Sequence, residues 1–183
     1  MDLYELSKSI LSLLTILAQA GLAAGFAARV LPNKPKIVVK LLSFFSKNAS
    51  ILAVLVSLFA TISSLFLSEI LGLAPCNLCW FQRALMYPIP AILLFSLIAK
   101  GKKHFRFVLP LVLGGAAVSL YHIYLQLSAS FSPFCPSNPT IGSSCSSIGF
   151  AGFGYVTIPV MALTGFLAIG FLASLSVGRK QSR

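Results

Sequence analysis

The sequence has 183 residues, of which 57% are hydrophobic and only 9% are charged, whereas soluble domains are about 45–50% apolar and about 25% charged. This composition excludes a soluble globular enzyme and an intrinsically disordered chain. The net charge of +11 would suggest a nucleic-acid partner in a soluble protein. Here the cations lie in short clusters between apolar segments. We therefore expect the clusters to determine the membrane topology, and we expect no nucleic-acid partner.

Five apolar segments are candidates to cross about 30 Å of hydrocarbon as helices, for which about 20 residues suffice. The sequence therefore predicts an all-α integral membrane protein that forms a single domain. The expected spans are residues 10–30, 50–72, 84–99, 107–127 and 156–177.

The first apolar segment allows a signal peptide as an alternative. Small residues such as Ala18, Ala20 and Ala24 are potential cleavage sites. The first nine residues, however, carry two acids and one lysine, which makes a poor amino-terminal region for a signal peptide. We therefore expect a retained helix.

Residues 32–49 allow two interpretations. Lys36, Lys40 and Lys47 alternate with apolar residues, as in a helix that lies in the cytoplasmic interface with its lysines toward lipid headgroups. The alternative is a longer second helix that begins early and whose lysines reach the membrane surface. The pattern favours neither.

The distribution of cations predicts the topology. All but two of the 14 cations lie at 29–47, 100–106 and 179–183, and the other two are Lys8 and Arg83. With five spans, an external N-terminus places all three clusters on one face, which the positive-inside rule identifies as cytoplasmic. We therefore expect a multi-pass protein with its N-terminus outside and its C-terminus in the cytoplasm.

All four cysteines fall on the predicted outer side. Cys76 and Cys79 precede the third span, and Cys135 and Cys145 lie in an external loop, 128–155, that contains no charged residue. Disulfides form and persist on the outer side of a bacterial-type cytoplasmic membrane. Four cysteines allow three pairings, of which 76–79 with 135–145 is the simplest.

A Cys-x-x-Cys pair constrains little of the unfolded chain as a disulfide, so a redox or metal role is more usual than a structural one. The cysteine spacings are not those of a compact zinc site, and we expect no metal. Cys79 should lie in the first turn of a helix with Arg83 one turn later on the same face. A helix N-terminus and a guanidinium both favour a thiolate, although Arg83 could also be an interfacial anchor.

Two segments resemble the disulfide bond formation protein B family, most closely its BdbC-like branch. The run PCNLCWFQR at 75–83 is similar to the first redox loop, and YHIYLQL at 121–127 with SPFC at 132–135 looks like the end of the third core helix and the second redox loop. The resemblance implies a four-helix transmembrane core within residues 50–183. Residues 1–49 then form one extra N-terminal transmembrane helix and a basic cytoplasmic interfacial segment.

The resemblance also implies a membrane thiol–quinone oxidoreductase. In such an enzyme the disulfide Cys135–Cys145 oxidises a DsbA-like thioredoxin-fold partner, and Cys135 forms the mixed disulfide. Electrons then pass to Cys76–Cys79 through transient pairing of Cys145 with Cys76. These four cysteines are the expected catalytic residues.

The quinone, ubiquinone or menaquinone, is expected beside Cys79 and near Arg83 and His122. Trp80 suits an aromatic belt and is also a candidate for lining the quinone site. Glu69 is the only acid in any span, and it is a candidate for proton handling or for an ion pair with Arg83.

The competing hypothesis is a non-catalytic polytopic membrane protein, such as a small permease subunit, with two structural external disulfides. A transporter would need polar residues at mid-membrane, and the spans offer almost none. We therefore favour the enzyme, with membrane lipid and quinone as its other partners.

Overall fold

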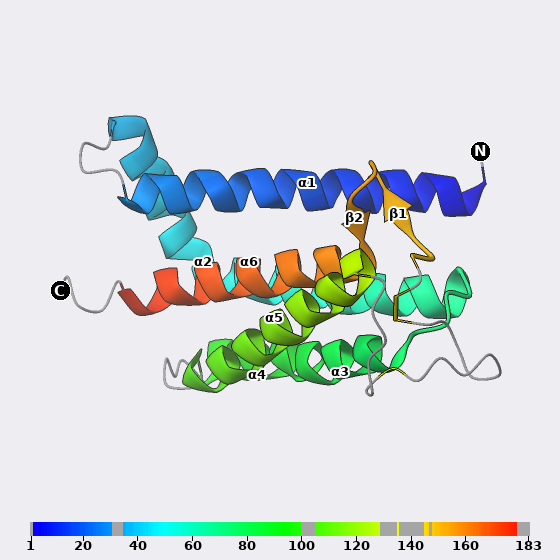
Figure 1. Cartoon of the computed structure of the whole chain (residues 1–183). Coiled ribbons are helices and arrows are strands. Elements are labelled where there is room, and N and C mark those ends of the chain that lie inside the picture. The colour runs from blue at the N-terminus through cyan, green and yellow to red at the C-terminus, as the bar shows by residue number, and fades with distance from the viewer. Residues whose placement is uncertain are drawn as a thin grey trace.

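The computed structural model describes residues 2–30, 35–99, 105–128, 135, 145–146 and 148–178. Five helices in this part of the chain are long and apolar enough to cross a membrane, which confirms the predicted all-α membrane fold. The five spans contain six α-helices, because α3 and α4 together form the third span. The helices are α1 (Leu3–Val30), α2 (Lys36–Leu65), α3 (Asn77–Met86), α4 (Pro88–Ile98), α5 (Phe105–Ser128) and α6 (Ile158–Gly178) (Figure 1). A π-helical turn, η1 (Phe66–Ile70), extends α2, and β1 (Ala151–Gly152) pairs with β2 (Val156–Thr157) in a small antiparallel hairpin that the sequence did not predict.

Residues 36–65 form a single helix, and the choice between an interfacial segment and an early start of the second span stays a prediction. One helix runs without a break from Lys36 to Leu65, and its first turns run at an angle to the rest (Figure 1). It crosses the boundary expected between residues 49 and 50, and Ala49 is 1% exposed within the core. The predicted basic clusters at 100–106 and 179–183 lie outside the described side chains.

The third span is made of two helices and begins earlier than expected. Cys76 is the N-cap of α3, so the helix starts directly after the first cysteine. α3 closes at Tyr87, whose N–H donates to the Arg83 carbonyl at 2.9 Å. Pro88 and Pro90 then open α4, because proline has no N–H to continue the hydrogen bonding of the preceding helix.

α2, α4, α5 and α6 enclose the main apolar core. Its fully buried members are Ala53, Ile89, Val108, Phe166 and Ile169. Gly115 in α5 permits the closest approach, since a Cβ there would overlap the ring of Phe166. Small residues serve membrane helices in this way because van der Waals packing drives their association.

α1 packs outside this core, parallel to α6 (Figure 1). Tyr4 donates to the Gly149 carbonyl at 3.2 Å, the Gln19 amide to Thr164 Oγ1 at 3.1 Å and Arg29 to Ser174 Oγ at 2.9 Å. The partners advance in step along both segments, so the two helices run in the same direction. Five spans that alternate in direction require this relation between the first and the fifth.

Candidate active site

The start of α3 brings the two cysteines of the CxxC motif together. Cys76 adopts an extended conformation as N-cap, and its Sγ accepts the backbone N–H of Cys79 at 3.4 Å. The two Sγ atoms lie 3.0 Å apart, and both residues are free thiols. Helix capping therefore holds the pair in the contact that a reversible disulfide needs.

The second cysteine pair lies against the first. Cys135 and Cys145 form a disulfide with their Cα atoms 5.9 Å apart. The Sγ atoms of Cys76 and Cys145 and a ring nitrogen of His122 all lie within 4.8 Å of one another. By distance these three groups could hold a metal ion, but Cys145 is bonded to Cys135 and offers no thiolate. The cluster instead places one sulfur of each pair within reach of exchange.

His122, on α5, joins the two pairs. Its Nε2 lies 3.2 Å from the carbonyl oxygen of Cys145 and 3.8 Å from Cys76 Sγ. A carbonyl oxygen only accepts, so Nε2 carries a hydrogen and donates it. His122 is 2% exposed, and its Nδ1 has no partner among the described residues. This nitrogen is available for a hydrogen bond to a bound group.

The surroundings of Cys76 stabilise its thiolate. A hydrogen bond from the Cys79 thiol lowers the pKa of Cys76 to about 4, and His122 contributes a further lowering that opposes the effect of burial. The thiolate is the reactive form in disulfide exchange. The surroundings of Cys76 therefore favour its thiolate form at neutral pH.

This ionisation gives a testable pH dependence. In reduced protein carrying Cys135→Ser and Cys145→Ser, the rate of iodoacetamide alkylation at Cys76, followed by mass spectrometry, should stay on its plateau down to about pH 5. It should then fall with a midpoint of about 4, because protonation removes the nucleophile. His122→Gln should move this midpoint upward. A midpoint near the ordinary thiol value of about 8.5 would contradict the assignment.

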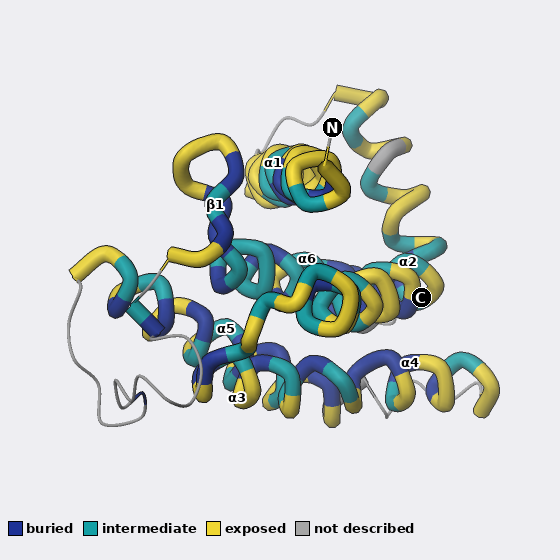
Figure 2. Tube along the Cα trace, turned by 90° about the vertical axis from the view of Figure 1, so that its right-hand side faces the viewer, coloured by how far each residue is buried: buried dark blue, intermediate teal, exposed yellow. Residues whose placement is uncertain are grey.

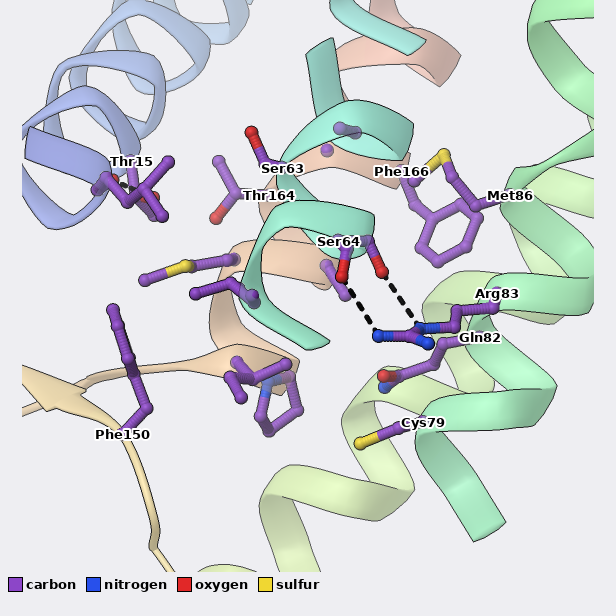
Figure 3. Close-up of a pocket in the computed structure, with 18 of the residues that line it drawn as sticks. Thr15, Ser63, Ser64, Cys79, Gln82, Arg83, Met86, Phe150, Thr164 and Phe166 are labelled. Carbon is purple, nitrogen blue, oxygen red and sulfur yellow. Dashed lines mark hydrogen bonds between the residues drawn. The ribbon is translucent and has the colours of Figure 1, made fainter. Parts of the chain in front are cut away.

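The side chain of Arg83 reaches from α3 to α2. Its Nε donates to Ser64 Oγ at 3.0 Å and its Nη2 to the Ser64 carbonyl at 2.9 Å (Figure 3). The guanidinium carbon also lies 5.3 Å from the centre of the Trp80 ring. Two bonds from one fork fix the direction of the group. Arg83 is thus held inside the bundle, half-buried, beside a cavity.

The cavity has a volume of about 560 Å³, within the usual range of small-molecule sites, about 300–1,000 Å³. Cys79, Arg83 and His122 all line it, and most of its wall is apolar. Further polar groups come from Thr15, Ser63, Gln82 and Thr164, and large apolar side chains from Met86, Phe150 and Phe166 (Figure 3). Gln126 and Phe59 also line the cavity. An apolar space with a cation, an unpartnered histidine nitrogen and a thiol at its wall fits a quinone.

Residues 46–176 match the family of the disulfide bond formation protein DsbB. The chain belongs to the DsbB family. A probable disulfide formation protein of Metapseudomonas resinovorans is 41% identical over 125 residues, covering 68% of this chain and 86% of the relative. The disulfide bond formation protein C of Bacillus subtilis is 38% identical over 125 residues, covering 68% and 89%. A probable disulfide formation protein of Coxiella burnetii is 32% identical over 126 residues, covering 68% and 85%. No solved structure matches.

The family match covers the core of the membrane protein and leaves α1 outside it. α1 nevertheless contributes to the wall of the cavity through Leu11, Leu14, Thr15 and Ala18. The helix that is additional to the DsbB-family core thus borders the candidate active site.

Two sequence candidates lie away from the cavity of this DsbB-family chain. Trp80 is 58% exposed and does not line it, and its contact with the site is the face that it presents to Arg83. Glu69 is exposed in η1 and accepts a hydrogen bond from Ser68 at 3.1 Å. The only ion pair among the described residues joins Lys8 and Glu5, so the expected pair of Glu69 with Arg83 is not formed.

Some lining residues were not found from the sequence. Gln82 is buried and its amide donates to Ser119 Oγ at 3.1 Å; its place three residues after Cys79, on the same helix face, was an available signal. Ser64 and Thr15 come from other helices, and no local pattern relates them to the CxxC motif.

Proposed function

We propose that this DsbB-family protein is a membrane thiol–quinone oxidoreductase that reoxidises a DsbA-like thioredoxin-fold protein outside the cytoplasm. One observation carries the proposal: Cys145 of the loop disulfide lies against Cys76, while Cys79 opens on the apolar cavity. Two purely structural disulfides have no need for either contact. The proposed path runs from the partner through Cys135–Cys145 to Cys76–Cys79 and then to quinone.

The first half of the cycle reduces the loop disulfide. A partner thiolate attacks Cys135, forms a mixed disulfide and releases Cys145 as a thiolate. Cys145 attacks Cys76, which forms the Cys76–Cys145 bond, breaks Cys76–Cys79 and leaves Cys79 as a thiolate. The second partner thiolate then displaces Cys135, and the partner departs as a disulfide with two electrons fewer.

The second half of the cycle restores the loop disulfide and transfers two electrons from the CxxC pair to an acceptor. Cys135 attacks Cys145, re-forms Cys135–Cys145 and releases Cys76, so that the CxxC pair holds both electrons as two thiols. This is the arrangement of sulfurs in the structure, a disulfide beside a reduced CxxC pair. A bound quinone supplies an acceptor for two electrons and two protons. Oxidation of Cys76 and Cys79 to a disulfide completes the cycle.

The chain's own groups support this chemistry at the cavity. The fixed charge of Arg83 can stabilise a thiolate at Cys79 or donate to a carbonyl oxygen of the acceptor. His122 can hold a proton at Nδ1 and pass it on, since Nε2 remains bound to the Cys145 carbonyl. Apolar walls exclude water and thereby strengthen both interactions.

The test uses purified protein in lipid nanodiscs, an added quinone and a reduced thioredoxin-fold protein. We expect quinone absorbance to fall in a one-to-one ratio with partner disulfides formed. Protein without added partner is the control. Failure of the intact chain to oxidise the partner, with all four cysteines present, would support the competing hypothesis of two structural disulfides.

The orientation in the membrane is a further part of the proposal. Both cysteine pairs lie at the end of the bundle where α1 begins, as the contact of Tyr4 with Gly149 indicates (Figure 1). Arg29, Lys36 and Lys40 lie at or beyond the other end of α1. By the positive-inside rule, the cysteines face outward and the C-terminus lies in the cytoplasm.

Labelling of intact bacterial cells checks this orientation. In a chain whose four cysteines are replaced by serine, an exposed Asn77→Cys thiol should react with a membrane-impermeant maleimide, because it lies beside Cys76. The matched Lys36→Cys thiol, also exposed, should react only after the cells are permeabilised. The reverse pattern would overturn the proposed orientation.

A further inference from the structure

We propose that α1 is a positioning element of the redox relay: it anchors the segment that follows Cys145 and so keeps Cys145 against Cys76. The inference rests on the proposed function, and it assigns a role to the helix that lies outside the residues matched by the DsbB family. The anchored segment, residues 148–157, contains the hairpin β1–β2. Figure 2 shows α1 end-on above α6 with this hairpin beside it.

The first anchor is at the beginning of α1. Tyr4 donates its hydroxyl hydrogen to the Gly149 carbonyl at 3.2 Å. Its ring also meets Phe150 edge-to-face, with the centroids 6.1 Å apart. Phe150 is fully buried and lines the cavity. Tyr4 therefore holds the chain at the residue where it enters the candidate active site.

The second anchor is a close backbone contact. Ser12 of α1 is fully buried, and its side chain fills the space where Gly152 has none. A Cβ added to Gly152 would lie 2.6 Å from the Ser12 Cβ and closer still to its hydroxyl. Position 152 of the hairpin therefore needs a glycine, because Ser12 of α1 lies too close to leave room for a Cβ.

The third anchor closes the hairpin. Tyr155 donates to Gln19 Oε1 at 2.7 Å, and the amide of the same Gln19 donates to Thr164 on α6 at 3.1 Å. Thr157 donates to Gln126 on α5 at 2.9 Å, one turn after His122. The hairpin is thereby held between α1 on one side and the core helices on the other.

These anchors reach Cys145 because little chain lies between them. Phe150 is the fifth residue after Cys145, so their Cα atoms are at most about 18 Å apart when the chain is fully extended. Fixing position 150 therefore limits how far Cys145 can move away from Cys76 and His122. Confinement of this kind raises the effective concentration of one thiol at the other.

The test measures the Cys76–Cys145 disulfide directly. A full-length chain carrying Cys79→Ser and Cys135→Ser retains these two cysteines alone. It is equilibrated in glutathione redox buffers, and the disulfide fraction is read by alkylation and mass spectrometry. No quinone and no protein partner take part. A failure of quinone-dependent turnover and a failure of this coupling are therefore separate results.

We expect Gly152→Ala to lower the effective concentration about tenfold, which corresponds to about 1.4 kcal/mol. Adding Ser12→Gly removes the overlapping side chain, and the nearest remaining atom is the Lys8 carbonyl oxygen at 3.6 Å. The double variant should therefore recover most of the loss. Gly21→Ala is the matched control, because nothing lies within 4 Å of a Cβ at that glycine of α1.

The Cys135–Cys145 disulfide serves as a control that distinguishes a loss of anchoring from a general loss of stability. In a chain with Cys76→Ser and Cys79→Ser, the Cys135–Cys145 equilibrium should stay within about twofold in every variant, because this bond closes within the loop. An equal drop for both disulfides, an unchanged Cys76–Cys145 equilibrium in Gly152→Ala, or no recovery with Ser12→Gly would each overturn the proposal.

Two milder substitutions test the anchoring of the hairpin without introducing a steric clash. Tyr4→Phe and Tyr155→Phe remove only the hydrogen bonds to Gly149 and Gln19, and together they should lower the same equilibrium. Tyr124→Phe on α5 is their control, since that side chain is 60% exposed. Equal values for the double variant and the control would refute the anchoring role.

Discussion

Replacing Cys145 with serine is expected to lower steady-state oxidation of the thioredoxin-fold partner by at least about a thousandfold. A serine oxygen cannot form the bond to Cys76, so electrons that enter at Cys135 have no path to the CxxC pair. Cys76→Ser, Cys79→Ser and Cys135→Ser should be equally inactive, because each removes one sulfur of the path. The measurement is quinone absorbance during turnover with excess reduced partner.

Single-turnover experiments distinguish the two pairs. Reduced Cys145→Ser protein still holds the thiols of Cys76 and Cys79, so it should reduce one equivalent of quinone and then stop. Cys79→Ser should lose this equivalent as well. Normal membrane insertion of each variant is the control. Substantial steady-state turnover in Cys135→Ser and Cys145→Ser would favour the structural interpretation of the loop disulfide.

The sequence predicted the features that depend on nearby residues. Span length and apolarity indicated five membrane helices, and the described residues contain five that are long and apolar enough to cross a membrane. The CxxC spacing and the residue four positions later placed Cys79 and Arg83 on one face of a helix, and both line the cavity. Cys79 lies in the first turn of α3, as predicted, because Cys76 is its N-cap. The membrane span therefore begins before residue 84, the start that the apolar run indicates.

The features that the sequence did not predict depend on distant residues. Tyr4 and Gly149 are 145 positions apart, and no periodicity within α1 indicates that it borders a cavity lined by α2, α3 and α6. Its rarity in a membrane span makes Glu69 a candidate, but its neighbours depend on the direction in which η1 turns the side chain. The side chain lies exposed beside Ser68 instead of meeting Arg83.

Arg83→Gln is expected to lower the quinone-dependent kcat/KM about ten- to a hundredfold. Loss of a charge-assisted hydrogen bond costs about 1–3 kcal/mol, which converts to this range of rates. Arg83→Lys keeps the charge but loses the planar fork, so it should raise the KM for quinone with a smaller loss of kcat. Turnover against quinone concentration measures both effects.

Arg83 also connects α3 to α2, and a variant of Ser64 separates this structural contribution from quinone binding. Ser64→Ala removes the hydroxyl that accepts from Arg83 Nε but keeps the carbonyl that accepts from Nη2. It should lower thermal stability slightly while leaving the quinone KM within about twofold, since the charge stays at the cavity. In all three variants the loop disulfide should oxidise one equivalent of partner at the normal rate, because Cys135 and Cys145 are untouched. Unchanged quinone dependence in Arg83→Gln would show that Arg83 serves only to hold the two helices together.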